Sequence, residues 1–145
     1  MAGIYLHIPF CKQACHYCDF HFSTNTDGRP QLLEAMRREI ELQKDYLENK
    51  KISSIYFGGG TPSILSPAEI RLLLDAVRKT HFVDTAAEIT LEANPDDLNS
   101  PWLSGLLESG VNRLSIGIQS FDDDILKFLN RAHDSQAAFK SVRDS

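Results

Sequence analysis

Three cysteines lie close together in the sequence, with three residues between Cys11 and Cys15 and two between Cys15 and Cys18. The sequence contains no other cysteine, and an odd, clustered set makes a poor framework for disulfide bonds. Cysteine thiolates are soft donors that hold iron–sulfur clusters. Three thiolates on a [4Fe–4S] cube leave one iron free to accept the amino and carboxylate groups of a small molecule. The spacing therefore indicates a cluster site within one short loop.

Two other interpretations of the cysteines stay open, namely a zinc site and buried structural thiols. A structural zinc ion usually takes four protein ligands. His7, His16 or His21 is near enough in the sequence to supply the fourth. Analysis of the bound metal separates these alternatives, because a cluster contains iron and sulfide.

Four further features have the residue types of a ligand site. The run Gly58-Gly59-Gly60-Thr61 is either a tight turn or a set of exposed amides that hold a carboxylate, since glycine permits close backbone approach. Glu92 is either satisfied by a neighbour or accepts hydrogen bonds from ribose hydroxyls or an amine. Gln119 is either a capped interior amide or a ligand contact. Arg131, taken alone, is a solvated charge at a helix end.

Strand-like and helix-like segments alternate along the chain, as in folds with a parallel sheet and right-handed crossovers. Ser66, Pro67 and Glu69 form the clearest helix start, with an N-cap and a capping box. Ser100-Pro101 opens a later helix and Gly110 closes it. The expected strands cover residues 3–9, 53–57, 88–93 and 111–118. Two other helices are expected over residues 31–48 and 122–129, and a further helix begins near residue 135. The sequence therefore predicts an α/β fold of about four βα units.

The chemically unusual residues all follow predicted strands. The cysteines follow the first strand and the glycine run follows the second, while Glu92 and Gln119 lie at the ends of the third and fourth. In parallel α/β folds, ligands bind at the carboxyl ends of the strands. We therefore expect these residues to meet at one edge of the sheet.

Composition limits the classes of partner. The formal net charge of the 145 residues is −5, and their basic residues are scattered among acids, which argues against a nucleic-acid partner. No apolar run approaches the roughly 20 residues that span a membrane. The chain begins directly with a strand-like segment and shows no secretory signal. These features predict a cytoplasmic protein that is not an integral membrane protein.

The motif CxxxCxxC, with an aromatic residue before its last cysteine, resembles the signature of the radical-SAM superfamily. Longer sequence segments resemble the oxygen-independent coproporphyrinogen III oxidase group, and most closely its HemW branch. These segments are YLHIPFC at 5–11, YCDF at 17–20, YFGGGTPS at 56–63, TLEANPDDL at 90–98 and NRLSIGIQSF at 112–121. The resemblance covers essentially the whole chain.

The resemblance implies a partial, TIM-like (β/α)6 barrel that binds a [4Fe–4S] cluster and S-adenosylmethionine. By motif, the three cysteines correspond to the cluster ligands, and the loop 59–61 corresponds to the one that holds the amino-acid end of S-adenosylmethionine. The other positions that correspond to contacts with this cofactor are Tyr5 near the cluster, Tyr17 beside the adenine, and Glu92, Gln119 and Arg131. No catalytic residue is assigned.

One departure from the oxidase pattern concerns position 20. The oxidases of this group have a further cysteine two residues after the last cluster ligand, where this chain has Phe20. The difference favours the HemW branch, whose members resemble heme chaperones that deliver heme to respiratory proteins. The resemblance thus implies heme or a porphyrinogen, a reductant protein and respiratory heme acceptors as partners. Oxidative decarboxylation of coproporphyrinogen III to protoporphyrinogen IX is the alternative.

A second departure is length. Four βα units do not close a barrel, so residues 1–145 are expected to form the N-terminal part of a radical-SAM core domain. The remaining strands of the barrel and the family's C-terminal domain are absent from this sequence.

Overall fold

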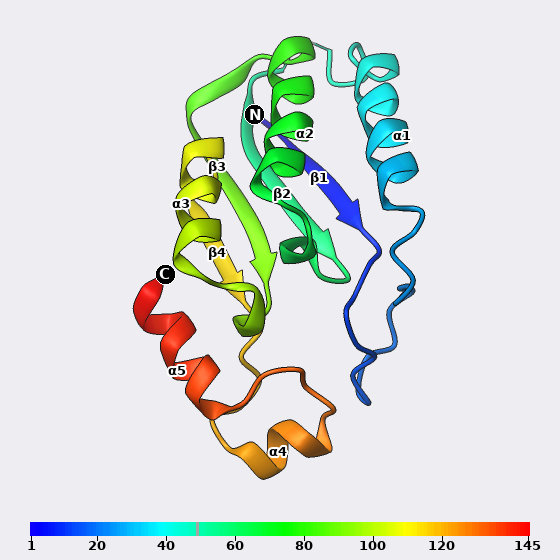
Figure 1. The fold of residues 1–145 in the computed structure, drawn as a ribbon. Helices are drawn as coiled ribbons and strands as arrows, with labels where there is room; N and C mark the ends of the chain where they lie inside the picture. Colours follow the sequence, from blue (N-terminus) through cyan, green and yellow to red (C-terminus); the bar gives the residue numbers. More distant parts are fainter. Residues whose placement is uncertain (49) are drawn as a thin grey trace.

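The computed structural model describes residues 1–48 and 50–145. Strands and helices alternate along the chain (Figure 1). The strands are β1 (Ala2–Ile8), β2 (Ile52–Gly59), β3 (Val83–Ala93) and β4 (Arg113–Ile116), and the α-helices are α1 (Arg29–Leu42), α2 (Pro67–Thr80), α3 (Ser100–Ser109), α4 (Asp123–Phe128) and α5 (Ser135–Asp144). Two short 3-10 helices, η1 (Pro62–Ile64) and η2 (Pro95–Asp97), follow β2 and β3. This order confirms the predicted α/β fold.

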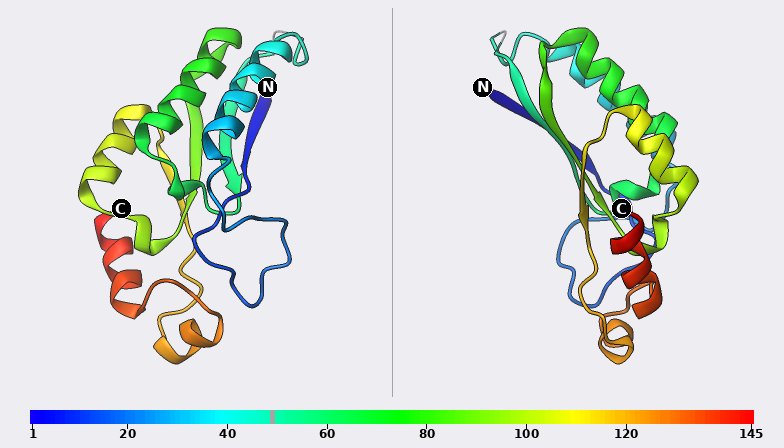
Figure 2. Two further views of the ribbon diagram at one scale, coloured as in Figure 1. Left: turned by 45° about the vertical axis from the view of Figure 1, so that its right-hand side comes forward. Right: turned by 90° about the vertical axis from the view of Figure 1, so that its left-hand side faces the viewer.

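The four strands form one parallel sheet in the order β1-β2-β3-β4. Helices α1, α2 and α3 all cover the same face of this sheet, as the right-hand view of Figure 2 shows. The register pairs Leu6 with Phe57 and Phe57 with Leu91. These three side chains are buried, and because successive strand residues point to opposite faces, their neighbours lie on the face that is not covered by helices.

Helix α2 provides the centre of the core. Its start is confirmed in full: the Ser66 hydroxyl accepts from the Glu69 amide, the Glu69 carboxylate accepts from the Ser66 amide, and Pro67 is the first helical residue. The apolar side chains that repeat along the helix are all completely buried. Those side chains are Ile70, Leu73, Leu74 and Val77. The sequence pattern and the core therefore agree here.

Two predicted elements each have one boundary that is wrong by at least five residues. The helix expected over 31–48 ends at Leu42, because residues 43–48 form turns in which the amides of Tyr46 and Glu48 donate to the carbonyls three residues earlier. The strand expected over 88–93 begins at Val83, which pairs with Ile52 ahead of an irregularity in the ladder. The long-range pairing that extends this strand is not visible in local sequence.

The strand expected over 111–118 is shorter than predicted. At its start, the Asn112 side chain accepts from the Ile89 amide and donates to the Ala87 carbonyl, so a side chain replaces part of the backbone ladder. After Ile116, the chain turns through Gln119, whose φ is +65°. The helices at 122–129 and from 135 are confirmed as α4, capped by Asp122, and α5, which begins at Ser135.

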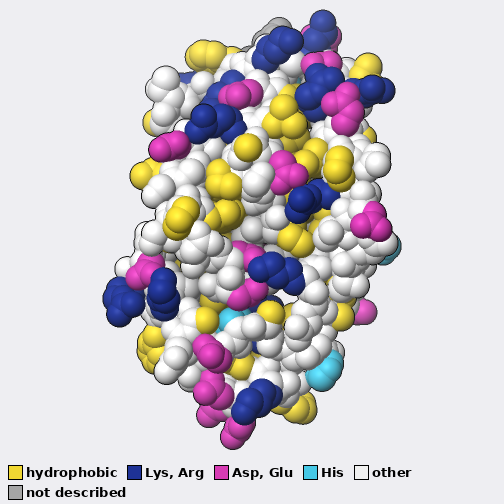
Figure 3. Space-filling view, in the orientation of Figure 1, with side chains coloured by type: hydrophobic (Ala, Val, Ile, Leu, Met, Phe, Trp, Pro, Cys, Tyr) yellow, Lys and Arg dark blue, Asp and Glu magenta, His cyan; other side chains and the backbone are white. Residues whose placement is uncertain are grey.

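The outer surface of the helices carries mixed charge. Basic and acidic side chains are interspersed over the face that Figure 3 presents, which has the orientation of Figure 1. Within the described residues, none of the helices combines the length and the apolar character needed to cross a membrane.

Candidate functional site

The loops that follow the four strands enclose a cavity of about 280 Å³. It lies at the carboxyl edge of the sheet, where the sequence predicted a ligand site. Its lining includes Cys11, Cys15, Tyr17, Cys18, Gly59, Gly60, Thr61, Glu92, Gln119 and Arg131. The structure thus brings together ten of the eleven predicted site residues, and only Tyr5 lies outside the cavity lining.

The thiols of the cysteine loop differ in their surroundings. Cys11 is 8% exposed, whereas Cys15 and Cys18 are half-buried, and all three are free. Burial raises the pKa of the Cys11 thiol, and the hydrogen bond from the Thr61 hydroxyl to its Sγ, at 3.4 Å, acts in the opposite direction. A thiolate at Cys11 therefore needs a positive partner to offset the loss of hydration.

Arg131 supplies positive charge beside the thiols. Its Nη1 donates to Cys15 Sγ at 3.3 Å and to the Tyr17 hydroxyl at 3.2 Å. Its Nη2 donates to Asn94 Oδ1 and to the Gly117 carbonyl, both at 2.8 Å. The Nε atom is buried and has no partner within the described residues. Arg131 is therefore part of the cavity wall, and the interpretation as a solvated helix-end charge is wrong.

The glycine run allows the second loop to approach the cysteine loop. Gly59 has a φ of +116°, which side chains strongly disfavour. A Cβ atom at Gly60 would lie 2.7 Å from the Phe10 carbonyl oxygen and 2.9 Å from Cys11 Sγ. The Gly60 amide also donates to the Ile8 carbonyl and the Thr61 amide to the Phe10 carbonyl. These contacts require the absence of a side chain, so the run is more than a simple turn.

Glu92 is held by groups on β2. Its carboxylate accepts from the Tyr56 hydroxyl at 2.7 Å and from the Gly59 amide at 3.2 Å. The hydrogen bond to Glu92 raises the pKa of Tyr56, and burial adds to the effect. An ionised carboxylate offers about four acceptor positions, so Glu92 retains capacity for a ligand.

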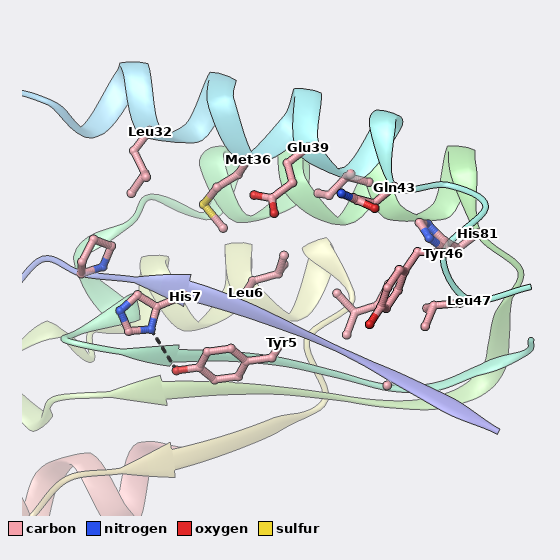
Figure 4. Close-up of a pocket in the computed structure, with 14 residues that line it drawn as sticks. Tyr5, Leu6, His7, Leu32, Met36, Glu39, Gln43, Tyr46, Leu47 and His81 are labelled. Atoms are coloured by element: carbon pink, nitrogen blue, oxygen red, sulfur yellow. Dashed lines mark hydrogen bonds between the residues drawn. The ribbon is translucent and has the colours of Figure 1, made fainter. Parts of the chain in front are cut away.

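Tyr5 contacts this network from outside the cavity. Its ring stacks on that of Tyr56, with 6.0 Å between centroids, and its hydroxyl lies 3.2 Å from His7 Nδ1. Both Tyr5 and His7 line a separate groove of about 660 Å³ between β1 and α1. Figure 4 shows Met36 and Glu39 of α1 pointing toward β1 across this groove.

Lys12 and Asp97, which the sequence did not single out, form a charged contact outside the cavity lining. Lys12 lies 3.0 Å from Asp96 and also contacts the buried Asp97. Burial lowers the pKa of Lys12, but hydrogen bonds to Asp97 and Asp96 outweigh it and raise that pKa overall. The Ser63 hydroxyl donates to Asp97 at 2.5 Å. Local sequence carries no indication of this contact, because Lys12 follows β1 and Asp97 follows β3, and β2 separates these two strands in the sheet.

Asn94, to which the sequence assigned no role, also lines the cavity. Its Oδ1 accepts from Arg131, and its Nδ2 donates to the Thr61 hydroxyl at 3.4 Å. Its place directly after β3 and before Pro95 was the available indication. His133 is buried, and its Nε2 donates to the Ile118 carbonyl at 3.0 Å. Burial lowers the pKa of His133.

The donor set fits an iron–sulfur cluster. Three soft thiol ligands line one cavity, with a guanidinium that can offset the negative charge of thiolates. In the described part of the chain, no three His, Cys, Asp or Glu side chains converge on a single point where one metal ion would bind. A cluster makes no such demand, since its thiolates bind different irons. The fold and this cavity define a class of protein: a parallel α/β half-barrel with a three-cysteine loop at the carboxyl edge of its strands.

Comparison with known proteins agrees with this class. The family model for the radical SAM superfamily matches residues 5–144. The chain belongs to the radical SAM superfamily. A [4Fe–4S] cluster and S-adenosylmethionine are the cofactors that this family implies.

Within this superfamily, the chain is similar to HemW heme chaperones and to HemN. The chain is 38% identical over 146 residues to the heme chaperone HemW of Haemophilus influenzae and 37% identical over 143 residues to that of Bacillus subtilis. These alignments cover 97% of this chain and 38% of each relative. The solved structure of coproporphyrinogen III oxidase (HemN) from Escherichia coli, a radical SAM enzyme, superimposes with a TM-score of 0.89 at 30% identity, covering 98% of this chain and 33% of that one. The chain therefore spans about two fifths of the length of the curated relatives.

Proposed function

We propose that this chain forms the cofactor-binding half of a HemW-like heme chaperone. The observation that carries the proposal is the cavity at the carboxyl edge, where three thiols, a glycine loop and a guanidinium meet. The similarity to HemW proteins over nearly the whole chain supports the same function. Residues 1–145 then represent the N-terminal part of a radical-SAM core domain.

In this proposal, Cys11, Cys15 and Cys18 each bind one iron of a [4Fe–4S] cluster. The rest of the cavity would hold S-adenosylmethionine. The contacts to it come from Tyr17, Gly59, Gly60, Thr61, Glu92, Gln119 and Arg131, while Tyr5 acts from the neighbouring strand through Tyr56. When bound and reduced, the cluster supplies the electron for radical chemistry, and the protein orients and shields the reactants.

The chain's own residues prepare the cavity for these groups. Arg131 stabilises negative charge on Cys15 and holds the Tyr17 ring in place. The Glu92 carboxylate, fixed by Tyr56 and Gly59, presents its remaining oxygen lone pairs to a ribose hydroxyl or an amine. Because these two hydrogen bonds already fix Glu92, its carboxylate is in place before a ligand binds.

The residue at position 20 supports heme as the ligand in this proposal. Phe20 is 75% exposed and lies at the rim of the same cavity, where the oxidases of this group have a cysteine. An exposed aromatic ring offers a surface for a planar apolar ligand such as heme. Heme, a reductant protein for the cluster and a respiratory heme acceptor are the proposed partners, and the cytoplasm is the proposed compartment.

The first experiment reconstitutes the protein anaerobically with iron and sulfide and records electron paramagnetic resonance after reduction. We expect a [4Fe–4S]⁺ signal that changes when S-adenosylmethionine is added, and a Cys15→Ser variant should lose it. Heme binding is then measured by absorption spectroscopy. Zinc in place of iron and sulfide would exclude the cluster, and a protein that binds the cluster but not heme would exclude the chaperone.

The structural similarity to HemN favours a second candidate, oxidative decarboxylation of coproporphyrinogen III. The test is an anaerobic assay for protoporphyrinogen IX that depends on S-adenosylmethionine. Product formation would favour the oxidase, and its absence from a protein that carries the cluster would reject it. A Phe20→Cys variant adds the missing thiol and shows whether position 20 separates the two functions.

A further inference from the structure

The cysteine loop is fastened to a segment more than a hundred residues away in the sequence. Gln13 Nε2 donates to the Asn130 backbone carbonyl at 2.9 Å and to Asn130 Oδ1 at 2.7 Å. In return, Asn130 Nδ2 donates to the Ala14 carbonyl at 2.7 Å. One amide side chain from each segment therefore closes the contact in both directions.

His16 extends this contact toward α4. Its backbone amide donates to the Leu129 carbonyl at 3.1 Å. Its ring Nδ1 lies 2.8 Å from the Phe128 carbonyl oxygen, which can only accept, so Nδ1 donates. The carbonyls at the C-terminal end of α4 are thus used by the cysteine loop. We call these hydrogen bonds, which join residues 13–16 to residues 128–130, the loop contact.

The backbone of Asn130 makes the loop contact possible. Its φ is +56°, in the left-handed region that asparagine tolerates better than most residues. The turn is closed by the Asn130 amide, which donates to the Lys127 carbonyl, and by the Arg131 amide, which donates to the Leu126 carbonyl. This conformation ends α4 and directs the next residue, Arg131, toward Cys15.

We propose that Asn130 is a positioning residue for the cysteine loop. Its side chain bonds Gln13 and Ala14, directly before Cys15, and its left-handed backbone places Arg131, which donates to Cys15. The part of this inference that concerns the cluster rests on the proposed function. The part that concerns the loop is independent of any cofactor.

The cofactor-independent test is hydrogen exchange of the His16 amide, whose N–H donates across the loop contact. In Asn130→Ala, we expect the protection of this amide to fall about tenfold, since two side-chain hydrogen bonds are lost and a side chain is placed in strained backbone. Asn130→Gly keeps the backbone conformation and should lose less. Gln13→Glu replaces a donor with an acceptor of the same shape and should match Asn130→Ala.

Asn112→Ala is the matched control. Asn112 is also an amide side chain that bonds the backbone in both directions, to Ile89 and Ala87, but far from the cysteines in the sheet register. Its loss should lower the melting temperature as much as the loss of Asn130 and leave His16 protection unchanged. If Asn130→Ala acted only by destabilising the whole fold, His16 protection would fall equally in Asn130→Ala and Asn112→Ala.

The second measurement uses the reconstituted protein. In Asn130→Ala and Gln13→Glu, we expect the reduced cluster to be lost to a chelator about tenfold faster and its spectral response to S-adenosylmethionine to weaken, with neither change in Asn112→Ala. If the unaltered protein holds no cluster, the proposed function fails, and His16 exchange alone decides the role of Asn130. If the cluster forms but the variants retain His16 protection and cluster lifetime within twofold, the positioning role is overturned while the function stands.

Discussion

The two faces of the sheet are stabilised in different ways. On the helix-covered face, Leu6, Phe57 and Leu91 form a continuous buried row. On the opposite face, the adjacent residues Tyr5 and Tyr56 are at least partly exposed and are held by stacking and hydrogen bonds. The same strands therefore carry an apolar core on one side and a polar, ligand-accessible surface on the other.

This difference separates stability from function along each strand. The stabilisation from apolar burial on the helix side depends little on the exact orientation of each side chain, because the hydrophobic effect is non-directional. The open side depends on particular distances, such as the 2.7 Å from the Tyr56 hydroxyl to Glu92. Substitutions on the helix-covered face should therefore mainly reduce stability, whereas substitutions on the open face should mainly reduce function. The following experiments test that separation.

The largest effect is expected for Phe57→Ala on the helix face. Phe57 is completely buried, so its truncation should reduce the free energy of unfolding by about 3–5 kcal/mol. Denaturant unfolding measures the change. Phe20→Ala, at a position that is 75% exposed, is the control with the same chemical deletion and should change stability by less than about 0.5 kcal/mol. Equal losses would break the proposed separation of the faces.

Gly60→Ala should have the next largest effect. The added Cβ meets the Phe10 carbonyl and Cys11 Sγ at distances that require the backbone to move. We expect a loss of about 1–3 kcal/mol in unfolding free energy together with weaker cluster incorporation. Gly28→Ala, where a Cβ meets nothing within 4 Å, is the control. An unperturbed Gly60→Ala protein would contradict the close approach of the two loops.

Tyr56→Phe removes one hydroxyl from the open face. Because this hydroxyl donates to Glu92 at 2.7 Å, we expect unfolding free energy to fall by about 1 kcal/mol and S-adenosylmethionine to bind more weakly. Denaturant unfolding measures the unfolding free energy, and calorimetry measures the binding of S-adenosylmethionine. Tyr46→Phe, at a residue that is 79% exposed, should change neither, and a similar result for both variants would remove Tyr56 from the site.

The smallest effect concerns charges that belong to neither face. Hydrogen bonds from Arg37 and Arg38 lower the pKa of Glu34 from about 4.5 to about 2. Since the folded-state pKa lies below the unfolded one, the contribution of Glu34 to stability is present above about pH 4.5 and is lost as pH falls through about 2. Carboxyl-carbon NMR titration measures this pKa, and Arg37→Gln should raise it. A titration unchanged by Arg37→Gln would assign the shift to another cause.

Local patterns in the sequence predicted much of the fold. The capping box at Ser66 and the apolar repeat that follows it located α2, because both depend only on residues within a few turns. The same holds for the end of α3, where Gly110 adopts a φ of +100°. The prediction for α1 extended too far because Leu47 packs against the core from a turn, and sequence periodicity cannot distinguish this from a helix.

The sequence by itself determined the alternation of strands and helices, the three-cysteine motif and the common edge at which the unusual residues meet, since parallel topology brings all strand ends together. Only the tertiary structure decided which of these residues touch. The contacts of Arg131 with Cys15, of Lys12 with Asp97 and of Asn130 with Gln13 join segments far apart in the chain. No local pattern contains such contacts, because they arise from the register of the strands and the path of the loops between them.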